Sequence, residues 1–239
     1  MGRAGERLGL ALSPERRAAR QDRLAEVAQA LIRERGDAGF SMTELALRAE
    51  VSPATPYNLL GSKAEILRRV ITDDFARFTD RLSHVRAANS LDFLLATSDL
   101  AVTHYEADRQ LHRGLLRAIF SADSAEARDV MSLEARSLWR ALVAAAFGSG
   151  DLQGVVGPDD ISNLFIRVIG ATAQTWSMDG WSPERFRLEM GLAARLILVA
   201  VVAPGRRDAL VKEIGHIASA LGIVREAALR QDVIALARS

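Results

Sequence analysis

The chain contains no cysteine, and little in it points to export or to a membrane. The absence of cysteine excludes disulfides and thiolate-bound metal sites. Residues 1–23 hold no apolar core of signal-peptide length. The longest nearly apolar run, residues 192–203, is interrupted by Arg195 and is too short to span a bilayer. We therefore expect a cytoplasmic protein.

Signatures of catalysis are missing as well. The sequence has no nucleophile elbow, no P-loop and no dinucleotide fingerprint. Its glycine-rich segment, residues 148–157, follows a predicted helix rather than a strand, so we interpret it as a connector. His104 and Asp108 stand one helical turn apart, but one pair supplies only two ligands and no second pair has the spacing to complete a site. We expect no enzyme, no cofactor and no metal.

Length and composition are those of a globular protein. The chain has 239 residues, of which 49% are hydrophobic and 26% charged, enough for one large domain or two modest ones with their own cores. The net charge is +1, but residues 1–70 carry +3 and the remainder −2. Basic residues crowd the first 23 positions: Arg3, Arg7, Arg16, Arg17, Arg20 and Arg23. A basic end on a nearly neutral chain suits contact with phosphates, although such ends are often simply solvated.

Helical periodicity runs through almost the whole sequence, and strand alternation is nearly absent. Ser13-Pro14, Ser62 with Glu65, and Ser182-Pro183 are typical helix starts. We predict an all-α protein of about nine to eleven helices. Three of the expected helices start at residues 14, 62 and 183, and the last of these runs to about residue 202. Other helices are expected at 43–49, 53–59, 91–108, 111–120, 125–147 and 159–178. One or two more follow residue 202.

The most informative segment is residues 40–63, FSMTELALRAEVSPATPYNLLGSK. Two short helices joined by a tight turn at Glu50 form a helix-turn-helix, whose second helix can enter the major groove of DNA. Lys63, in the first turn of the next helix, can reach a backbone phosphate. The predicted DNA-binding residues are Thr43, Ser52, Ala54, Thr55, Pro56, Tyr57, Asn58 and Lys63.

Over about residues 23–70 the chain resembles the TetR family of transcriptional regulators. The resemblance rests on the order and spacing of a dozen residues: Gly36, Phe40, Thr43, Leu45, Ala46, Ala49, Val51, Ser52, Thr55, Tyr57, Lys63 and Leu67. It implies a three-helix DNA-binding domain over residues 1–62 and a helical ligand-binding and dimerisation domain over 63–239. It also implies that Tyr57 and Lys63 bind phosphates of the DNA backbone.

Two residues depart from the family pattern. Glu50 stands where the family usually has glycine, and a left-handed glutamate costs roughly 1 kcal/mol unless the turn has another shape. Pro56 removes one helical hydrogen bond, to the Ser52 carbonyl, and predicts a short or distorted first turn.

The part of the chain after residue 62 is expected to dimerise and to hold a ligand. The helix from 183 becomes apolar nearly all round from Leu192. We predict that it pairs, with the preceding helix, against a second copy; burial inside one subunit is the alternative. The predicted interface comprises Ile166, Gly170, Ala173, Ser177, Leu192, Leu196 and Val199. A largely apolar pocket between helices is predicted from Phe78, Phe93, Thr97, His104, Leu115, Ile119, Phe120, Trp139, Phe165, Ile169, Thr172 and Trp176.

The sequence thus favours a dimeric regulator that binds a double-stranded, palindromic operator and is released, as a repressor, by a small apolar effector. The alternative is a helical small-molecule-binding or interaction protein whose DNA-reading head is vestigial, which Glu50 and Pro56 make conceivable.

Overall fold

The computed structural model describes residues 13–120 and 125–236, with side chains for residues 13–120 and 133–227. These residues form ten α-helices and no strand; one isolated antiparallel bridge joins Leu152 and Val202. The predicted all-α class is confirmed. The helices are α1 (Pro14–Arg35), α2 (Met42–Arg48), α3 (Ala54–Leu60), α4 (Lys63–Ser83), α5 (Ser90–Ala107), α6 (Arg109–Phe120), α7 (Ala125–Gly148), α8 (Pro158–Asp179), α9 (Pro183–Leu198) and α10 (Pro204–Leu236).

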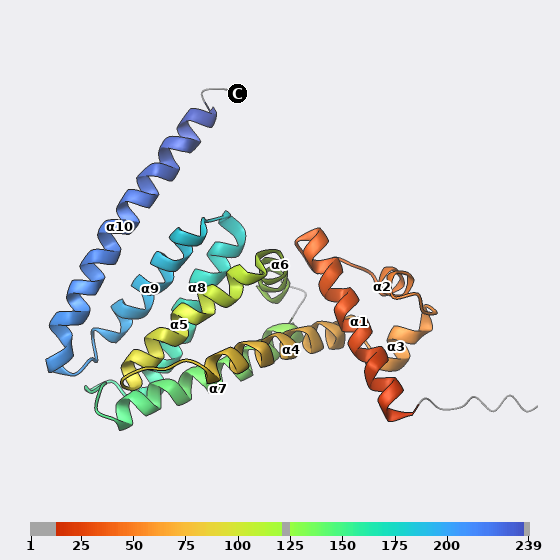
Figure 1. Cartoon of the computed structure of the whole chain (residues 1–239), viewed down its shortest axis with the longest axis horizontal. Coiled ribbons are helices and arrows are strands. Elements are labelled where there is room, and N and C mark those ends of the chain that lie inside the picture. Colours follow the sequence, from red (N-terminus) through yellow and green to blue (C-terminus); the bar gives the residue numbers. More distant parts are fainter. Residues whose placement is uncertain (1–12, 121–124, 237–239) are drawn as a thin grey trace, which may run out of the picture.

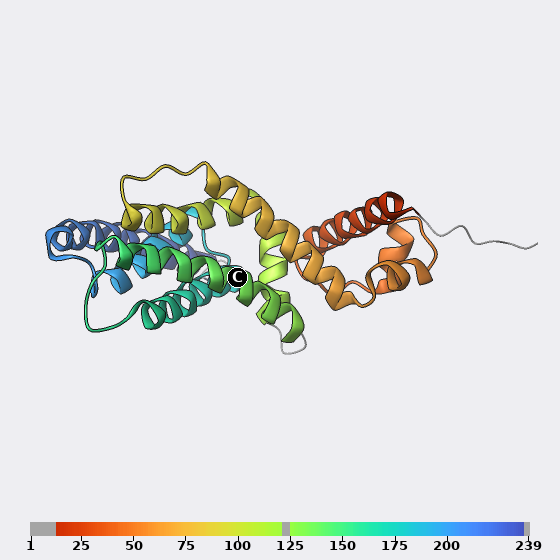
Figure 2. The ribbon, with the colours of Figure 1, turned by 90° about the horizontal axis from the view of Figure 1, so that it is seen from below.

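The helices divide into a small head and a larger body (Figures 1 and 2). The head consists of α1, α2, α3 and the first turns of α4, and α4 then runs on into the body. The head core includes Leu24, Phe40 and Ile66, and it also takes in Leu111 and Leu115 from α6. Head and body therefore share α4 and α6. The predicted domain boundary at residue 62 stays a prediction.

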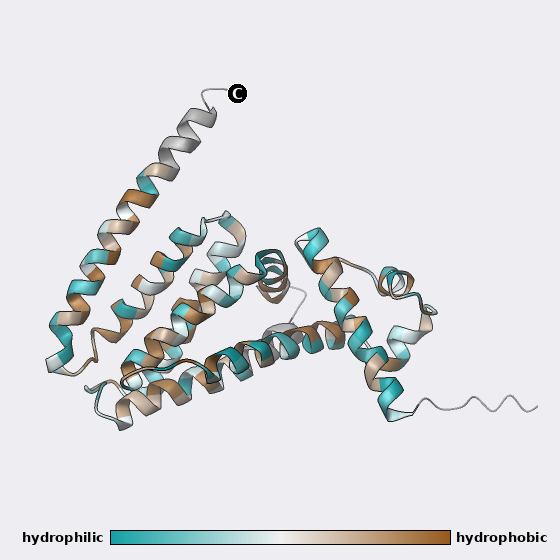
Figure 3. Ribbon diagram, viewed as in Figure 1, coloured by the Kyte–Doolittle hydropathy of each residue, from teal (hydrophilic) through white to brown (hydrophobic). Residues whose placement is uncertain are grey.

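Side-chain caps fix where several helices begin. The hydroxyls of Ser13, Ser62 and Ser182 accept hydrogen bonds from backbone N–H groups three residues on, as the sequence predicts. Each cap satisfies one of the four first-turn donors that lack a helical partner. Most helices show one hydrophobic and one hydrophilic face (Figure 3), and the hydrophobic faces make the cores.

The C-terminal part differs from the prediction in one boundary. Helix α9 ends at Leu198 rather than near 202, and a single long α10 follows. α10 packs along α9, where the Arg195 Nε lies 2.8 Å from the Glu213 carboxylate and the Arg225 Nη2 2.9 Å from the Glu189 carboxylate. The far half of α10 extends beyond the body (Figure 1).

The turn between α2 and α3 has the left-handed shape that glycine favours. Glu50 has φ 56°, and it is the one non-glycine residue with positive φ among those described. The Val51 N–H donates to the Ala46 carbonyl at 3.0 Å and closes the turn. Of the two alternatives that the sequence left open, a left-handed glutamate or a turn of another shape, the structure has the left-handed glutamate.

Replacing Glu50 with glycine is expected to stabilise the protein relative to Glu50→Ala by about 0.5–1 kcal/mol. Glycine relieves the left-handed strain, and the larger entropy of the unfolded glycine chain offsets part of that gain. Urea denaturation of the two variants measures the difference. Equal stabilities would contradict strain at this turn.

Candidate DNA-reading surface and ligand cavity

Helix α3 stands on the outside of the head, and most of its predicted DNA-facing side chains are exposed. Ala54, Tyr57 and Asn58 are exposed, with Tyr57 at 56%. Thr43, on α2, and Ser52, before α3, are exposed as well, whereas Thr55 is half-buried. An exposed seven-residue helix after a tight turn has the shape that can enter a major groove.

The first turn of α3 corrects the prediction about Pro56. Helix α3 begins at Ala54, so Pro56 lies in the first turn, where an N–H would have no helical partner in any case. The Ser52 carbonyl accepts from the Thr55 N–H at 2.9 Å instead. Pro56 is buried, so it packs inward rather than toward DNA. Pro53 occupies the cap position of α3, and the Ser52 hydroxyl pairs with the Thr55 hydroxyl at 2.8 Å.

Helix α1 holds the end of α3 and places positive charge beside it. The Gln21 Nε2 donates to the Leu59 carbonyl at 2.7 Å, and the Arg17 guanidinium donates to the Asn58 carbonyl at 3.5 Å. Arg16 and Arg20 are exposed on the same helix. Arg17 thus lies beside the α3 surface, and exposed cations on this helix suit phosphate contact. Arg3 and Arg7 of the predicted basic end lie outside the described residues.

Lys63 is the first residue of α4, and its ammonium lies 5.0 Å from the centre of the Phe40 ring. Burial lowers the pKa of Lys63, and Arg35 acts in the same direction while Asp37 opposes them. A cation held at a helix N-terminus next to free N–H groups is placed to share an anion with them.

The body holds a partly open cavity of about 410 Å³ between α4, α5, α6, α7 and α8. Its wall is mainly apolar and aromatic. Seven predicted ligand-binding residues line it: Phe78, His104, Leu115, Ile119, Phe120, Trp139 and Ile169. A cavity of this size and lining suits a small, largely apolar molecule.

Five residues predicted to line the pocket lie elsewhere. Trp176 is buried against Phe186, with ring centroids 4.6 Å apart, and Phe165 packs against Trp139 at 5.0 Å. The other three are Phe93, which packs against a separate small cluster, Thr97, whose hydroxyl bonds to its own helix, and Thr172, which faces an outer groove.

One part of the cavity wall is polar. The Asp74 carboxylate lies 3.0 Å from His104 Nε2 and 3.1 Å from His112 Nε2. Burial raises the pKa of the Asp74 carboxyl, but the contacts with His104 and His112 outweigh burial and hold that pKa well below its usual range. Burial, with a smaller contribution from Asp74, raises the pKa of Tyr105 to about 12.

This cluster corrects the interpretation of His104 and was missed by the sequence analysis. Asp108 caps the end of α5 and accepts from the Arg33 Nε at 2.7 Å, so it does not face His104. The partners of His104 come instead from α4 and α6. A signal was present, because Asp74 interrupts the apolar stripe of Ile71 and Phe78 on α4. Lining residues also missed are Phe75, Tyr105, Leu116, Arg136, Arg167 and Gln174.

The predicted dimer residues fall on two opposite sides of the α8–α9 pair. Ile166, Gly170 and Ala173 line the cavity, and Ser177 is buried, so this stripe of α8 faces inward. Leu192 and Leu196 of α9 instead line an outer groove, and Val199 packs against the body core. The groove also includes Val155, Val156, Leu164, Val168 and Thr172.

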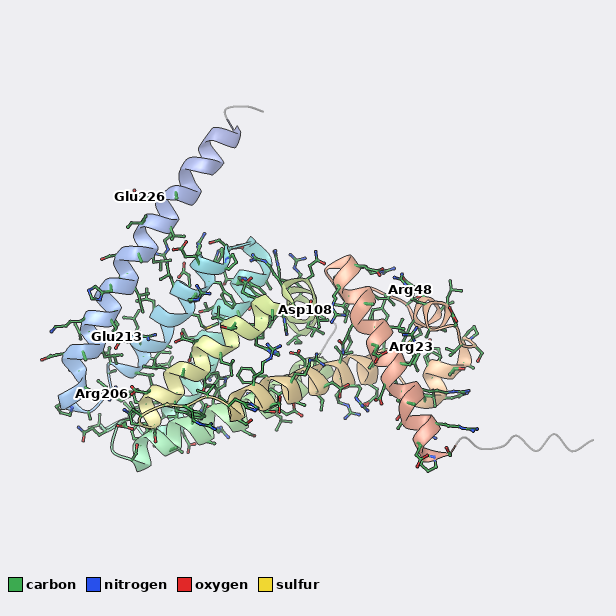
Figure 4. The ribbon with its side chains drawn as sticks, in the orientation of Figure 1. Arg23, Arg48, Asp108, Arg206, Glu213 and Glu226 are labelled. Atoms are coloured by element: carbon green, nitrogen blue, oxygen red, sulfur yellow. The ribbon has the colours of Figure 1, made fainter. Side chains whose placement is uncertain are left out.

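Helix α6 connects the cavity wall to the head. The Arg33 guanidinium of α1 lies 2.7 Å from the Asp108 carboxylate, and Figure 4 shows Asp108 at the junction of head and body. The Arg117 guanidinium donates to the Gly36 carbonyl at 3.3 Å. Gly114 lies against α1, where an added Cβ would stand 2.5 Å from the Ile32 Cγ2. Because α6 contacts α1 directly, a movement of α6 would displace α1.

Gly114→Ala is expected to destabilise the protein by about 1–3 kcal/mol, because the new methyl group overpacks the contact between α1 and α6. Gly215→Ala is the matched control, since that helical glycine has open space around it. Alanine there should stabilise the protein by about 0.5–1 kcal/mol. Thermal unfolding of both variants tests the contact, and an unchanged midpoint for Gly114→Ala would contradict it.

Comparison with solved structures finds the same fold at low sequence identity. RolR bound to resorcinol is 17% identical, with 83% of this chain and 95% of RolR covered and a TM-score of 0.63. SmeT, the repressor of the Stenotrophomonas maltophilia efflux pump SmeDEF, is 16% identical, with 77% and 91% covered and a TM-score of 0.64. FadR from Bacillus subtilis in complex with stearoyl-CoA is 16% identical, with 74% and 97% covered and a TM-score of 0.63.

Two further comparisons give no match. No protein-family model matches the chain, and no curated protein matches its sequence. Within the described residues, none of the helices has both the length and the apolar character needed to cross a membrane. The solved structures include two described as putative TetR-family regulators, which cover 76% and 75% of this chain and 99% and 95% of their own. The chain therefore has the fold of the TetR-family transcriptional regulators.

Proposed function

We propose that this protein is a dimeric, sequence-specific DNA-binding regulator whose affinity for DNA responds to a small molecule in the body cavity. The observation that carries the proposal is the exposed α3, presented by a tight turn and flanked by the cations of α1 and by Lys63. Thr43, Tyr57 and Asn58 supply side chains that can bond to bases or phosphates.

The alternative of a vestigial head loses its support. That alternative depended on distortion of the turn by Glu50 and of the first turn of α3 by Pro56. The left-handed turn forms with glutamate in it, and α3 runs unbroken from Ala54 to Leu60. The head keeps its own buried core and its capped helices.

A second copy is proposed to cover the outer groove between α8 and α9. Leu164 is 47% exposed, Leu196 52% and Val155 fully exposed, so a single chain leaves a contiguous apolar surface in water. Helix α10 covers another side of α9, which leaves the groove as the accessible face. A two-fold pair would present two copies of α3, as a palindromic operator requires.

The proposed response to ligand follows from the shared helices. α4 and α6 line the cavity and also contribute to the head core. A ligand that fits one arrangement of these helices better than another shifts the position of the head, and DNA favours one position in turn. RolR was solved with resorcinol and FadR with stearoyl-CoA, and these complexes support a regulator that responds to a small molecule. Repression relieved by an apolar effector is the form we propose.

Tyr57→Phe and Lys63→Gln are each expected to weaken binding to the DNA flanking the protein's own gene roughly tenfold. Each variant loses one contact with DNA. A lost phosphate contact also lowers, by about one, the slope of the logarithm of affinity against the logarithm of salt concentration. Fluorescence anisotropy at several salt concentrations measures both effects. Arg207→Gln, an exposed charge on α10, is the control and should leave affinity unchanged.

Two results would overturn the proposal in separate ways. Wild-type protein that binds its flanking DNA no better than a random duplex would remove the DNA-binding function. A small molecule that raises the melting temperature but leaves DNA affinity unchanged would remove the coupling between cavity and head.

A further inference from the structure

Three side chains capable of binding a metal meet in the cavity wall. Asp74 comes from α4, His104 from α5 and His112 from α6. The two imidazoles are buried, at 3% and 4% exposed, and their ring centroids are 4.7 Å apart. All three residues line the cavity, so the cluster is open to a small molecule there.

The hydrogen bonds of His112 leave its other nitrogen facing an acceptor. His112 Nδ1 lies 3.1 Å from the Tyr105 carbonyl and 2.9 Å from the Asp108 carbonyl. Carbonyl oxygens only accept, so Nδ1 carries the hydrogen. A neutral imidazole has one N–H, so Nε2 carries a lone pair. That lone pair points at the Asp74 carboxylate, an acceptor 3.1 Å away. A cation, either a proton or a metal ion, must lie between them.

Two arginines contact the cluster from outside the cavity wall. His104 Nδ1 lies 3.4 Å from the Arg81 guanidinium, and Arg77 lies 3.0 Å from the Asp74 Oδ1. Both arginines are exposed and can move into water at little cost. Once Arg81 withdraws, the His104 hydrogen can occupy Nδ1, which frees Nε2 as a ligand.

We propose that Asp74, His104 and His112 form a binding site for one divalent transition-metal ion such as Zn²⁺, Co²⁺ or Ni²⁺. Imidazole and carboxylate ligands suit these ions. Ligands about 2.0–2.1 Å from an ion stand about 2.9–3.4 Å apart around it. The 3.0 and 3.1 Å separations of the carboxylate from the two Nε2 atoms fall in that range. The backbone carbonyls on His112 Nδ1 are the usual support of a metal-binding histidine.

The site would add a specific ligand chemistry to the cavity. Three protein ligands leave further coordination positions, and the cavity lies beside them. A molecule with an apolar body and metal-binding oxygen atoms would use both features. This inference goes beyond the proposed regulator function, because metal binding is measured without DNA and either can fail alone.

The test uses the full chain after treatment with a chelator and dialysis. Titration with Co²⁺ is expected to give one ion per chain and a visible absorption spectrum, and Zn²⁺ should displace the Co²⁺. His112→Gln and His104→Gln are each expected to weaken binding at least about 100-fold. His84→Gln and His216→Gln, both exposed histidines, are the controls and should bind as the wild type does.

A second measurement covers the case in which a variant fails to fold. Zinc added to ¹⁵N-labelled wild-type protein should shift the ring-nitrogen resonances of two histidines and leave those of the other two in place. Absence of stoichiometric binding would overturn the proposal, as would wild-type affinity in a folded His112→Gln. The proposal would also be overturned if both ring nitrogens of His112 were protonated and their resonances did not shift with zinc, because a proton would then lie between His112 and Asp74.

Discussion

Trp176→Ala is expected to destabilise the protein by about 3–5 kcal/mol, the range for truncating a fully buried tryptophan. The Trp176 ring is 0% exposed and stacks on Phe186 with a centroid separation of 4.6 Å and an interplanar angle of 15°. Its indole N–H donates to the Glu106 carboxylate at 2.9 Å, and Arg109 lies over its face at 5.5 Å. Alanine would leave a cavity where α5, α8 and α9 meet.

Two conservative variants separate the ring from its hydrogen bond. Trp176→Phe keeps most of the stack and loses the bond to Glu106, so it should cost about 1–2 kcal/mol. Trp181→Phe is the matched control, because the buried Trp181 N–H has no hydrogen-bond partner among the described residues. Removing this unpaired N–H in Trp181→Phe should leave the free energy of unfolding nearly unchanged. Urea denaturation followed by circular dichroism measures all three. A Trp176→Ala variant within 1 kcal/mol of the wild type would show that this junction is not a rigid core.

Trp176 also shows where prediction from the sequence stopped. Periodicity locates the apolar side of a helix, and it placed Trp176 on the inner side of α8 correctly. Periodicity does not tell whether an inward-facing side chain packs against another helix or lines a cavity. Trp139 and Ile169 line the cavity, whereas Trp176 and Phe165 fill the core beside it. That distinction depends on helix crossings, which local pattern does not encode.

The helix-turn-helix was predicted more fully, because local chemistry determines it. Caps, the turn at Glu50 and the short helix at 54–60 involve neighbours in sequence. The polar cluster could not be derived in the same way. Asp74, His104 and His112 stand on three helices, and only the packing of those helices brings them within hydrogen-bond distance. The inward stripe of α8 was assigned to a partner for the same reason, since small residues fit either a cavity or a close helix.

Asp74→Asn is expected to cost about 3 kcal/mol at pH 7 in a buffer that contains a chelator. The carboxylate is 14% exposed and holds His104, His112 and Arg77 together, and loss of its charge leaves these groups without an anion. Asp73→Asn is the matched control one residue earlier on α4. Asp73 pairs with Arg69 at the surface, where such pairs contribute between nothing and about 1 kcal/mol.

The penalty for Asp74→Asn should also depend on pH in a defined direction. The contacts with the two histidines hold the pKa of Asp74 below its unfolded value of about 3.9. Its stabilising contribution is therefore complete above that value and is lost as the pH falls toward the lower folded pKa. Urea denaturation at pH 7, 5 and 3.5 should show the gap between wild type and Asp74→Asn narrowing below about pH 4. A gap that widens between pH 5 and pH 3.5 would contradict a lowered pKa of Asp74.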